Sequence, residues 1–350
     1  MKILSGLYGR AMLLRRAWYA AQADRRRRLG RPVISVGNLV LGGSGKTPVV
    51  ARLARLLAEA GERPAILSRG YGRRRAADGV VVVSDAERVL ATPEESGDEP
   101  YMLARSLPGV PVLVSSDRHL AGRLAERRLG CTLHLLDDGF QHVRLERDVD
   151  LLVMSVADLE AQLLPFGRLR EPLSAAHAAD ALLVAGGEAD VETVAGRIGV
   201  AQAFRVAPRY GTPRYVAGDR SASGDGPRRA LAVAGIARPE RFVRALRALG
   251  WQIVGEKVFR DHHWFTSRDV AAIERAAAES GAEVVMTTEK DAVRCAGARL
   301  GRAIPWLYLP LDVTVEPADA FAPWLAGRLA AARRRLSLAG SGGDGDGVAA

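Results

Sequence analysis

The sequence predicts an α/β fold with a mostly parallel sheet and flanking helices on both faces. From Pro32 onward, short apolar runs rich in β-branched residues alternate with segments whose apolar residues recur at helical spacing. This alternation is typical of parallel sheets, in which helices connect the strands. Right-handed crossovers place the loops after the strands along one edge, where ligands bind. The predicted strands are Val33–Val36, Ala65–Leu67, Val112–Val114, Leu133–Leu136, Leu151–Met154 and Ala181–Val184.

The chain divides into five predicted segments. Residues 1–29 form a separate basic helix, and residues 30–208 carry the first alternating block. Residues 209–229 are rich in Gly, Pro, Ser and Arg, which predicts a linker. A second, shorter alternating block in residues 230–336 predicts a smaller C-terminal α/β domain. Residues 337–350 are mostly Gly, Ser, Asp and Ala without periodicity, so we expect a disordered tail.

The helix predicted within residues 1–29 is both apolar and basic. Trp18 and Tyr19 follow its apolar stripe, and such a helix suits a lipid headgroup layer. Packing of the stripe on the rest of the domain, with the arginines in solvent, is the alternative. The stripe comprises Ile3, Leu4, Leu7, Tyr8, Ala11, Leu14 and Trp18, and the basic residues are Lys2, Arg10, Arg15, Arg16 and Arg25 to Arg28.

Composition narrows the class of protein. The 350 residues carry 50 Lys and Arg against 40 Asp and Glu, a net charge of +10. This excess suits a nucleotide, a nucleic acid or an acidic membrane, although an Arg-rich genome also raises the count. No apolar run approaches the ~20 residues of a membrane span, and the N-terminus lacks signal-peptide features, so a cytoplasmic chain is expected. Cys131 and Cys295 match no ligand spacing, which predicts reduced thiols.

A phosphate-binding loop is predicted in VGNLVLGGSGKTP, residues 36–48. A strand leads into a Gly-rich loop, whose glycines let backbone N–H groups surround phosphate oxygens. A helix then begins at Gly45-Lys46-Thr47, so that Lys46 reaches the β- and γ-phosphates and Thr47 binds Mg²⁺. Val40 stands where the P-loop pattern has its first glycine. The predicted ATP-binding residues are Val40, Leu41, Gly42, Gly43, Ser44, Gly45, Lys46 and Thr47, in a P-loop NTPase-like fold.

A second nucleotide element is expected at the end of a neighbouring strand. The run Leu133–Leu136 ends in Asp137 and Asp138, which fits a Walker B carboxylate that binds Mg²⁺ directly or through water. A strand that ends in two aspartates is weak evidence alone, but it gains weight at the same sheet edge as the P-loop. Together with Thr47, these residues predict the metal site.

Seven blocks of the sequence resemble the signature blocks of the tetraacyldisaccharide 4'-kinase family, in family order over roughly residues 1 to 330. They are VGNLVLGGSGKTP (36–48), LSRGYGRR (67–74), ESGDEPYMLA (95–104), LDDGFQH (136–142), LLPFGRLREPL (163–173), FRDHHWF (259–265) and TTEKDAVR (287–294). The family also lacks the first P-loop glycine, so Val40 fits it. The tail lies outside the resemblance.

The resemblance implies an enzyme that phosphorylates the 4'-hydroxyl of a tetraacylated glucosamine disaccharide 1-phosphate with MgATP, forming lipid IVA. Such a protein works peripherally on the cytoplasmic face of the bacterial inner membrane. An acceptor with four acyl chains is met at the bilayer, so the resemblance favours lipid contact by the basic helix. The expected partners are therefore the lipid A precursor and the anionic inner-membrane surface, without nucleic acid, and a monomer is expected.

The resemblance also implies a catalytic dyad of Asp98 in GDEP and His262 in DHH, beside Lys46. The Asp-His pairing favours His262 over His263. Either Asp98 or His262 accepts the hydroxyl proton, and a carboxylate that fixes the imidazole tautomer assists this step. The dyad requires the C-terminal domain to fold over the nucleotide edge. The predicted substrate-binding residues are Arg69, Arg118, Gln141, Arg170 and Glu171.

Simpler explanations exist for several of these residues. Asp98 is placed to cap a helix near Pro100, His262 and His263 adjoin an aromatic cluster, and the arginines suit surface ion pairs. A P-loop GTPase or ATPase switch or chaperone is the main rival function. It requires a guanine-specificity motif or a metal-binding tract, and the sequence has neither. A nucleic-acid-binding protein would need aromatic platforms, yet aromatic residues are only 5% of the chain.

Overall fold

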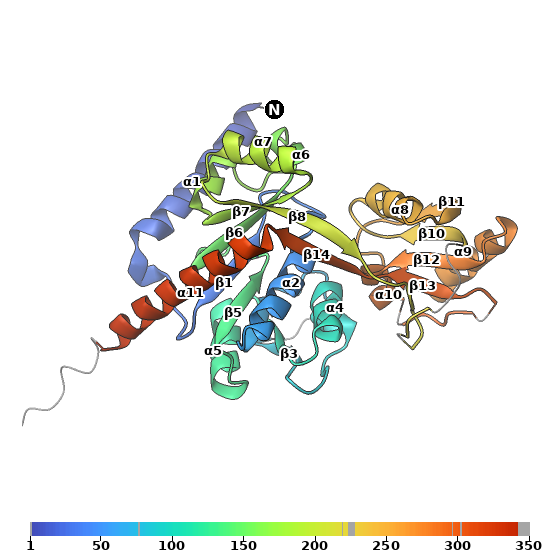
Figure 1. Ribbon diagram of the computed structural model, residues 1–350, viewed down its shortest axis with the longest axis horizontal. Coiled ribbons are helices and arrows are strands. Elements are labelled where there is room, and N and C mark those ends of the chain that lie inside the picture. Colours follow the sequence, from blue (N-terminus) through green and yellow to red (C-terminus); the bar gives the residue numbers. More distant parts are fainter. Residues whose placement is uncertain are drawn as a thin grey trace, which may run out of the picture.

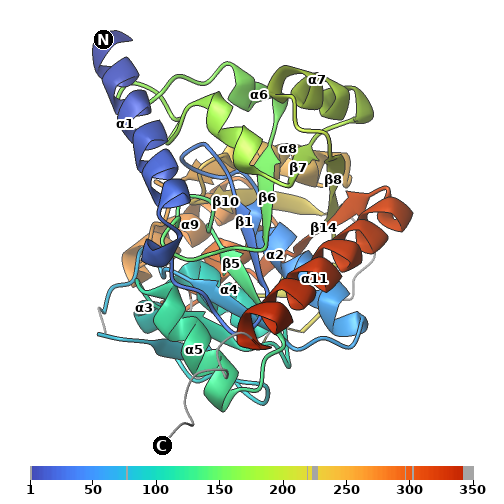
Figure 2. The same ribbon diagram turned by 90° about the vertical axis from the view of Figure 1, so that its left-hand side faces the viewer.

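The computed structural model describes residues 2–341, except for residues 76, 77, 219, 223–227, 296 and 302. The chain forms two sheets (Figures 1 and 2). The larger sheet has nine strands in the order β14-β8-β7-β6-β1-β5-β2-β4-β3. Its strands are β1 (Val33–Gly37), β2 (Pro64–Ser68), β3 (Val81–Ser84), β4 (Val112–Val114), β5 (Leu133–Asp137), β6 (Val149–Met154), β7 (Ala181–Ala185), β8 (Ala203–Tyr210) and β14 (Leu311–Glu316).

The larger sheet confirms the predicted parallel α/β fold. All six predicted strands are present, and the pairings among them are parallel, with antiparallel strands β3 and β14 at the edges. In the register of β1 with β5, Val36 lies opposite Asp137. The loops after these two central strands therefore begin side by side. This register places the predicted P-loop next to the predicted Walker B carboxylates.

Helices cover both faces of the larger sheet. One face packs against α2 (Lys46–Glu59), α4 (Asp98–Ser106) and α11 (Ala318–Ser341). The other face packs against α5 (Arg118–Arg128), the 3₁₀ helix η2 and α7 (Glu188–Ile198). Because both faces of the sheet are covered, the side chains on both sides of each central strand are buried. The sequences of these strands are therefore continuous apolar runs. The remaining helices of this part are α1 (Lys2–Ala21), η1 (Ala23–Arg25), α3 (Pro93–Ser96), α6 (Val156–Leu159) and η2 (Leu173–Ala178).

The smaller sheet forms the second part of the molecule, in the order β11-β10-β12-β13-β9. It lies to one side of the larger part, and strands β8 and β14 run towards it (Figure 1). Two apolar clusters line its two faces, one beneath α8 and the other beneath α9. Its elements are β9 (Arg214–Tyr215), β10 (Arg229–Ala234), α8 (Pro239–Ala248), β11 (Gln252–Val258), α9 (Ser267–Glu279), β12 (Val284–Thr288), α10 (Glu289–Arg294) and β13 (Trp306–Leu309).

The predicted C-terminal boundaries differ from this topology. The second domain was expected to extend from residue 230 to 336, but after Pro310 the chain returns to the larger sheet. There β14 pairs with β8, and α11 packs its apolar stripe against the larger sheet. The predicted linker 209–229 also contributes β9 to the smaller sheet. Helix α11 continues to Ser341, five residues into the predicted tail, and residues 342–350 lie outside the described residues.

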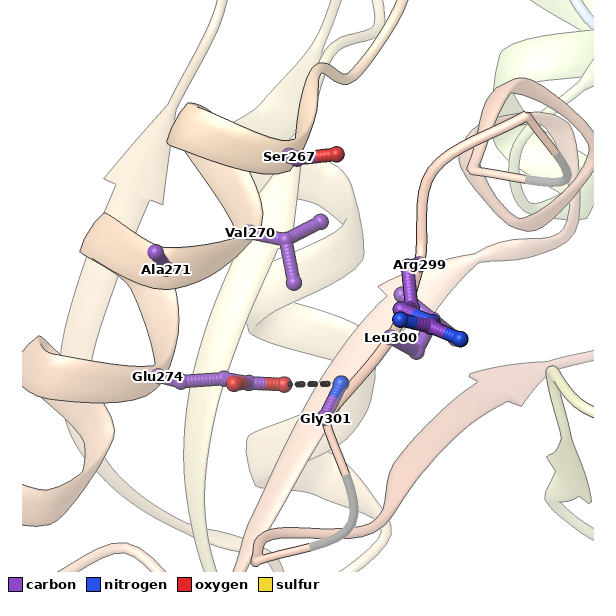
Figure 3. Close-up of a pocket in the computed structure, with 7 residues that line it drawn as sticks. All are labelled: Ser267, Val270, Ala271, Glu274, Arg299, Leu300 and Gly301. Atoms are coloured by element: carbon purple, nitrogen blue, oxygen red, sulfur yellow. Dashed lines mark hydrogen bonds between the residues drawn. The ribbon is translucent and has the colours of Figure 1, made fainter.

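The smaller part has a hollow of ≈ 410 Å³ between α9 and the 299–301 loop (Figure 3). Glu274 from α9 closes one side of it, where its carboxylate accepts hydrogen bonds from the Gly301 amide (2.8 Å) and the Trp306 indole (3.1 Å). The first bond holds the loop onto α9 and the second holds β13 onto α9, so Glu274 has a structural role. The described helices include none with the length and apolar character needed to cross a bilayer.

Candidate active site

The predicted P-loop lies between β1 and α2. Gly42 and Gly45 have φ angles of +81° and +84°, which side chains other than glycine rarely adopt. Val40 occupies the first motif position and is buried, and it forms an isolated bridge with Leu169. A buried apolar side chain therefore stands at the position of the usual first glycine. The loop leads directly into α2, and the partial positive charge of a helix N-terminus favours phosphate.

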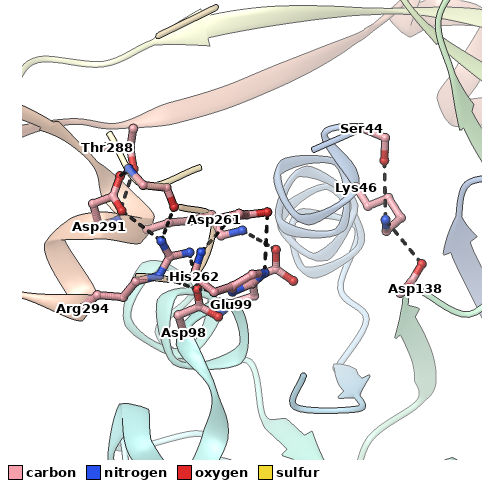
Figure 4. A network of polar contacts seen from close by, with 12 residues as sticks. Ser44, Lys46, Asp98, Glu99, Asp138, Asp261, His262, Thr288, Asp291 and Arg294 are labelled. Atoms are coloured by element: carbon pink, nitrogen blue, oxygen red, sulfur yellow. Dashed lines mark hydrogen bonds and ion pairs between the residues drawn. The ribbon is translucent and has the colours of Figure 1, made fainter. Parts of the chain in front are cut away.

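Lys46 begins α2 and turns towards the end of β5. Its ammonium lies 3.1 Å from Asn38 Oδ1 and 3.4 Å from Asp138 Oδ1 (Figure 4). The Asn38 amide donates in turn to Val40 O at 2.8 Å and to Ser44 Oγ at 2.7 Å. Asn38 thus connects both sides of the loop. The sequence reasoning assigned it no role.

Arg170 joins the P-loop to the Walker B position. Backbone bonds between Leu41 and Arg168 and between Arg170 and Leu39 hold its segment beside the loop. Its guanidinium then donates to both oxygens of Asp138, at 2.9 Å each. Burial raises the pKa of Asp138, but Lys46 and Arg170 outweigh burial and lower it to about 2. Asp138 is therefore an anion held between two cations.

Asp137 has the opposite environment. It is buried, and its Oδ1 has no hydrogen-bond partner within the described part of the chain. Burial, together with the nearby carboxylates of Glu99 and Asp138, raises its pKa to about 7. A buried carboxylate oxygen without a donor is suited to a cation. Thr47, the second residue of α2, is buried at the same sheet edge.

These residues fit a magnesium ion that phosphate helps to bind. Among the described residues, no group of three or more His, Cys, Asp or Glu side chains is arranged to hold a metal by itself. Mg²⁺ usually takes one or two carboxylates and completes its octahedron with phosphate oxygens and water. Asp137 and Asp138 with the Thr47 hydroxyl supply that kind of incomplete set.

Asp98 and His262 meet although they lie on different parts of the molecule. Asp98 begins α4 on the larger part, and His262 lies in the loop between β11 and α9 on the smaller part. His262 Nδ1 lies 3.0 Å from Asp98 Oδ2 (Figure 4). His262 has a φ of +60°, so its backbone is held in a conformation that few residues adopt. His263 instead contacts Asp269, at 3.2 Å.

The charge state of Asp98 follows from its neighbours. Burial would raise the pKa of Asp98, but the hydrogen bond from His262 and the charges of Lys290 and Arg294 hold it well below its usual range. A carboxylate that stays charged fixes the proton of a neutral His262 on Nδ1 and leaves Nε2 as the acceptor. In Figure 4 the dyad and Lys46 flank the start of α2. Glu99, next to Asp98, is close enough to raise the pKa of Asp137.

An arginine-lined cavity of ≈ 540 Å³ opens beside Asp138. Arg118 is buried in its wall, and its Nε has no hydrogen-bond partner among the residues that the structure describes. Burial and the neighbouring Arg69 lower the pKa of Arg118 to about 10. The lining includes four predicted substrate residues, Arg69, Arg118, Gln141 and Arg170, with Arg15, Arg27, Arg144 and His142.

Two further residues, Glu171 and His142, belong to this region. Glu171 is buried outside the cavity lining and pairs with Arg16 at 2.7 Å, so its direct partner is helix α1. His142 lines the cavity although the sequence reasoning gave it no role. Burial, with Arg118 and Arg147, lowers the pKa of His142 to about 4, so it is neutral at pH 7.

Helix α1 attaches to the site by its polar side chains. Arg15 donates to Gln141 O at 3.3 Å, Arg16 donates to Phe140 O at 3.1 Å, and Tyr8 donates to Arg170 O at 2.9 Å. The opposite stripe of α1 is exposed, and it comprises Ile3, Leu4, Leu7, Leu13, Leu14 and Trp18. The alternative in which the apolar stripe packs on the domain is therefore wrong.

Comparison with known proteins identifies a family that matches this chain. The family described as tetraacyldisaccharide-1-P 4'-kinase matches residues 1–330. A tetraacyldisaccharide 4'-kinase of Syntrophus aciditrophicus is 40% identical over 350 residues, covering 92% of this chain and 90% of that protein. One from Anaeromyxobacter sp. strain Fw109-5 is 42% identical over 308 residues, covering 85% of this chain and 82% of that protein.

A solved structure resembles the whole molecule. The crystal structure of LpxK from Aquifex aeolicus in complex with ATP is 30% identical and has a TM-score of 0.73. The match covers 93% of this chain and 97% of that chain. The P-loop beside two aspartates, the cross-domain dyad and these matches lead to one assignment: this chain belongs to the tetraacyldisaccharide-1-P 4'-kinase family.

Proposed function

We propose that this chain transfers the γ-phosphate of ATP to the 4'-hydroxyl of a tetraacylated glucosamine disaccharide 1-phosphate, forming lipid IVA. The observation that carries this proposal is the 3.0 Å contact between Asp98 and His262 near the P-loop. A sugar hydroxyl is a weak nucleophile that must lose its proton as it attacks phosphorus, and a positioned histidine accepts such protons. A nucleotide switch has no use for this pair.

His262 is the general base of the proposed reaction. Asp98 has a strongly lowered pKa and is buried, so it is a poor proton acceptor. It instead fixes the Nδ1 proton of His262 and stabilises the imidazolium that forms when Nε2 accepts the hydroxyl proton. This division of roles follows from the opposite environments of the two groups: Asp98 is buried, and His262 is partly exposed.

The P-loop residues Val40 to Thr47 are proposed to bind the phosphates of ATP. Lys46 moves from Asp138 to the β- and γ-phosphate oxygens, and the amides at the start of α2 complete the cradle. Thr47, Asp137 and Asp138 are the proposed holders of Mg²⁺, which neutralises phosphate charge as it develops. Arg170 keeps Asp138 in place, because its two hydrogen bonds fix both carboxylate oxygens.

The arginine-lined cavity is proposed to receive the polar part of the acceptor. Arg69, Arg118 and Gln141 face the position that a disaccharide phosphate would occupy next to Asp138. Guanidinium groups match phosphate oxygens in geometry and charge. The polar side of α1 borders this cavity through Arg15, and we propose that the exposed apolar stripe on the other side of the helix lies in the anionic surface of the inner membrane. A monomer that binds peripherally to the cytoplasmic face suits this arrangement.

A kinase assay tests the proposal. The purified chain is incubated with labelled ATP, Mg²⁺ and tetraacyldisaccharide 1-phosphate in detergent, and the lipid products are separated. We expect a bisphosphorylated lipid that forms only when Mg²⁺ is present. ATP turnover at the same rate with and without lipid, and no labelled lipid, would favour the ATPase-switch alternative.

A further inference from the structure

Arg294 is buried directly behind the dyad. It ends α10 in the smaller part, its side chain is 0% exposed, and Asp98 on the larger part is its partner. Arg294 Nε donates to Asp98 Oδ2 at 2.7 Å, and NH2 forms an ion pair with the same oxygen. That oxygen also contacts His262 Nδ1. One carboxylate oxygen is therefore shared between the general base and a buried guanidinium.

Two further contacts hold Arg294 in place. Its NH1 donates to Gly235 O at 2.6 Å and to Asp291 Oδ1 at 2.9 Å. Asp291 is itself held by the Gly235 amide at 3.0 Å and by the Thr288 hydroxyl at 2.6 Å. The guanidinium is thus fixed by Gly235, which follows β10, and by Asp291 of its own helix, which Thr288 at the end of β12 holds in turn. A group fixed on both sides transmits its geometry to Asp98, because neither partner is free to rotate.

The other oxygen of Asp98 has a separate partner. Asp98 Oδ1 accepts the amide of Glu99 at 3.0 Å, in the first turn of α4. The carboxylate is therefore oriented by its own helix and by Arg294, and His262 adds the third contact. Beside this group, Lys290 pairs with Glu99 at 2.6 Å, so two residues one turn apart on α10, Lys290 and Arg294, contact two successive residues of α4.

We propose that Arg294 is a positioning residue of the phosphoryl transfer: it holds Asp98 charged and aimed at His262 Nδ1, and so it orients the Nε2 that accepts the hydroxyl proton. The inference rests on the proposed function, since it assigns a role within the same reaction. Because Arg294 and Asp98 belong to different parts of the molecule, the base is oriented only while the smaller part is docked on the larger one. Arg294 is the last residue of the segment TTEKDAVR, so the proposal gives this segment a role in the reaction.

A pH profile separates this role from a purely structural one. The positive charge of Arg294 weakens proton binding by the Asp98–His262 pair, so its removal makes the pair bind a proton more tightly. His262 is then neutral, and able to accept a proton, only at higher pH. The acid limb of the pH profile of kcat therefore moves to higher pH. The other groups that face the pair are Lys290 and Asp291 of α10, Glu99 of α4, Asp261 beside His262, and Tyr71 of the loop after β2.

The test compares Arg294→Met and Arg294→Lys in the lipid kinase assay over a pH series. For Arg294→Met we expect kcat at pH 7 to fall about 10- to 100-fold, a part of what general-base catalysis contributes. The acid limb should move up by about one pH unit, as for loss of a neighbouring charge, and KM for ATP should change less than about two-fold. Arg294→Lys keeps the charge, so its acid limb should stay near the wild-type position while kcat recovers in part.

Two controls keep the result decisive. Arg247→Met removes an exposed ion pair of the smaller part, with Glu256, and should leave both the rate and the profile unchanged. Adding Arg294→Met to Asp98→Asn should change kcat less than about two-fold, because the arginine acts through that carboxylate. If Arg294→Met alone fails to fold, this double variant avoids an unpaired buried Asp98, while Asp291 keeps its hydrogen bonds from the Gly235 amide and the Thr288 hydroxyl.

The outcomes distinguish the two proposals. A fall in kcat without movement of the acid limb, or an equal fall in the Asp98→Asn background, would overturn the positioning role. A wild-type chain that makes no bisphosphorylated lipid contradicts the proposed function itself. An active wild type whose Arg294→Met variant matches it contradicts only the role of Arg294.

Discussion

Asp138 and His262 share an unusual backbone conformation. Both have positive φ angles, +57° and +60°, although neither is glycine. Such conformations cost about 1–3 kcal/mol and persist only where surrounding contacts hold them. Arg170 and Lys46 hold Asp138, and Asp98 holds His262. The strain therefore marks the two residues that the phosphate and the hydroxyl proton would meet.

Removal of either dyad residue should slow the chemical step and leave nucleotide binding intact. We expect His262→Ala and Asp98→Ala to lower kcat about 10²- to 10⁴-fold, since this is the usual contribution of a positioned base. Neither side chain contacts the P-loop, so affinity for ATP should stay nearly unchanged. Steady-state kinetics with isothermal titration of ATP measures both quantities. A large loss of ATP affinity in either variant would show that the residue has been assigned to the wrong step.

Asp137 should make the nucleotide-free protein less stable as pH rises. Its pKa is raised from 3.8 to about 7 in the folded chain, by burial first and then by Glu99 and Asp138. Between these values the folded state keeps a proton that the unfolded state has lost, so stability falls with increasing pH. In Asp137→Asn this loss is absent, and the Tm difference between variant and wild type should widen from about pH 5 to about pH 8.

The same variant tests the metal assignment. MgATP compensates the charge of Asp137 and binds only the folded state, so it should raise the Tm of the wild type. Asp137→Asn should show a much smaller MgATP shift while keeping its higher Tm without nucleotide. Equal MgATP shifts in both proteins would remove Asp137 from the metal site. Differential scanning fluorimetry with and without Mg²⁺ provides the measurement.

Some of these site residues follow from local sequence patterns, and others do not. The P-loop and the Asp137-Asp138 pair follow from local patterns of strand, glycine and acid. Asp98 and His262 are 164 residues apart, and only a resemblance to a family joined them before the structure did. Arg294 lies 196 residues from Asp98, and no pattern in the sequence assigned it a role. Contacts that depend on how two sheets dock have no signal in local periodicity.

Helix α1 shows what periodicity does and does not determine at the scale of an element. Its apolar spacing predicted a helix within residues 1–29, and the structure has one at Lys2–Ala21. Periodicity defines two faces without deciding which one meets the protein. That choice comes from Arg15, Arg16 and Tyr8, whose donors reach the carbonyls of Gln141, Phe140 and Arg170. These buried carbonyls need donors, so the polar face packs inwards.

Acidic substitutions on the exposed stripe should weaken membrane binding without unfolding the helix. Leu7→Glu and Leu14→Glu place charges on side chains that are 59% and 70% exposed. We expect each to lower binding to anionic phospholipid vesicles by about 10-fold, because an inserted leucine contributes about 1.5–3 kcal/mol. Vesicle sedimentation measures the effect. Leu249→Glu, on an exposed leucine that ends α8, is the matched control and should bind like the wild type.

At the scale of the whole molecule, the C-terminal segment completes the nucleotide-binding part. The chain leaves the larger sheet after β8, builds the smaller sheet, and returns as β14 beside β8. Helix α11 then covers β8, with Phe321 stacked edge-on against Phe204 at 5.0 Å between ring centroids. The sequence predicted a contiguous second domain because strand and helix patterns carry no record of which sheet they join. Pairing between strands that are far apart in the sequence decides which sheet each strand joins.

This topology predicts that damage to α11 destabilises the nucleotide-binding part. Phe321 and Leu325 are 2% and 1% exposed and pack with the α2 side of the larger sheet. Truncation of each to alanine costs about 2–5 kcal/mol, so a Phe321→Ala/Leu325→Ala variant approaches the whole stability of a domain, about 5–15 kcal/mol.

The unfolding transition that ATP stabilises should therefore shift to lower temperature in the double variant, and ATP affinity should fall with it. Ala330→Ser, on the exposed side of the same helix, should change neither. Thermal unfolding with and without MgATP, followed by limited proteolysis, identifies which part unfolds first. If the variant instead released the 230–309 segment first while ATP binding persisted, α11 would belong energetically to the smaller part, as a contiguous 230–336 domain requires.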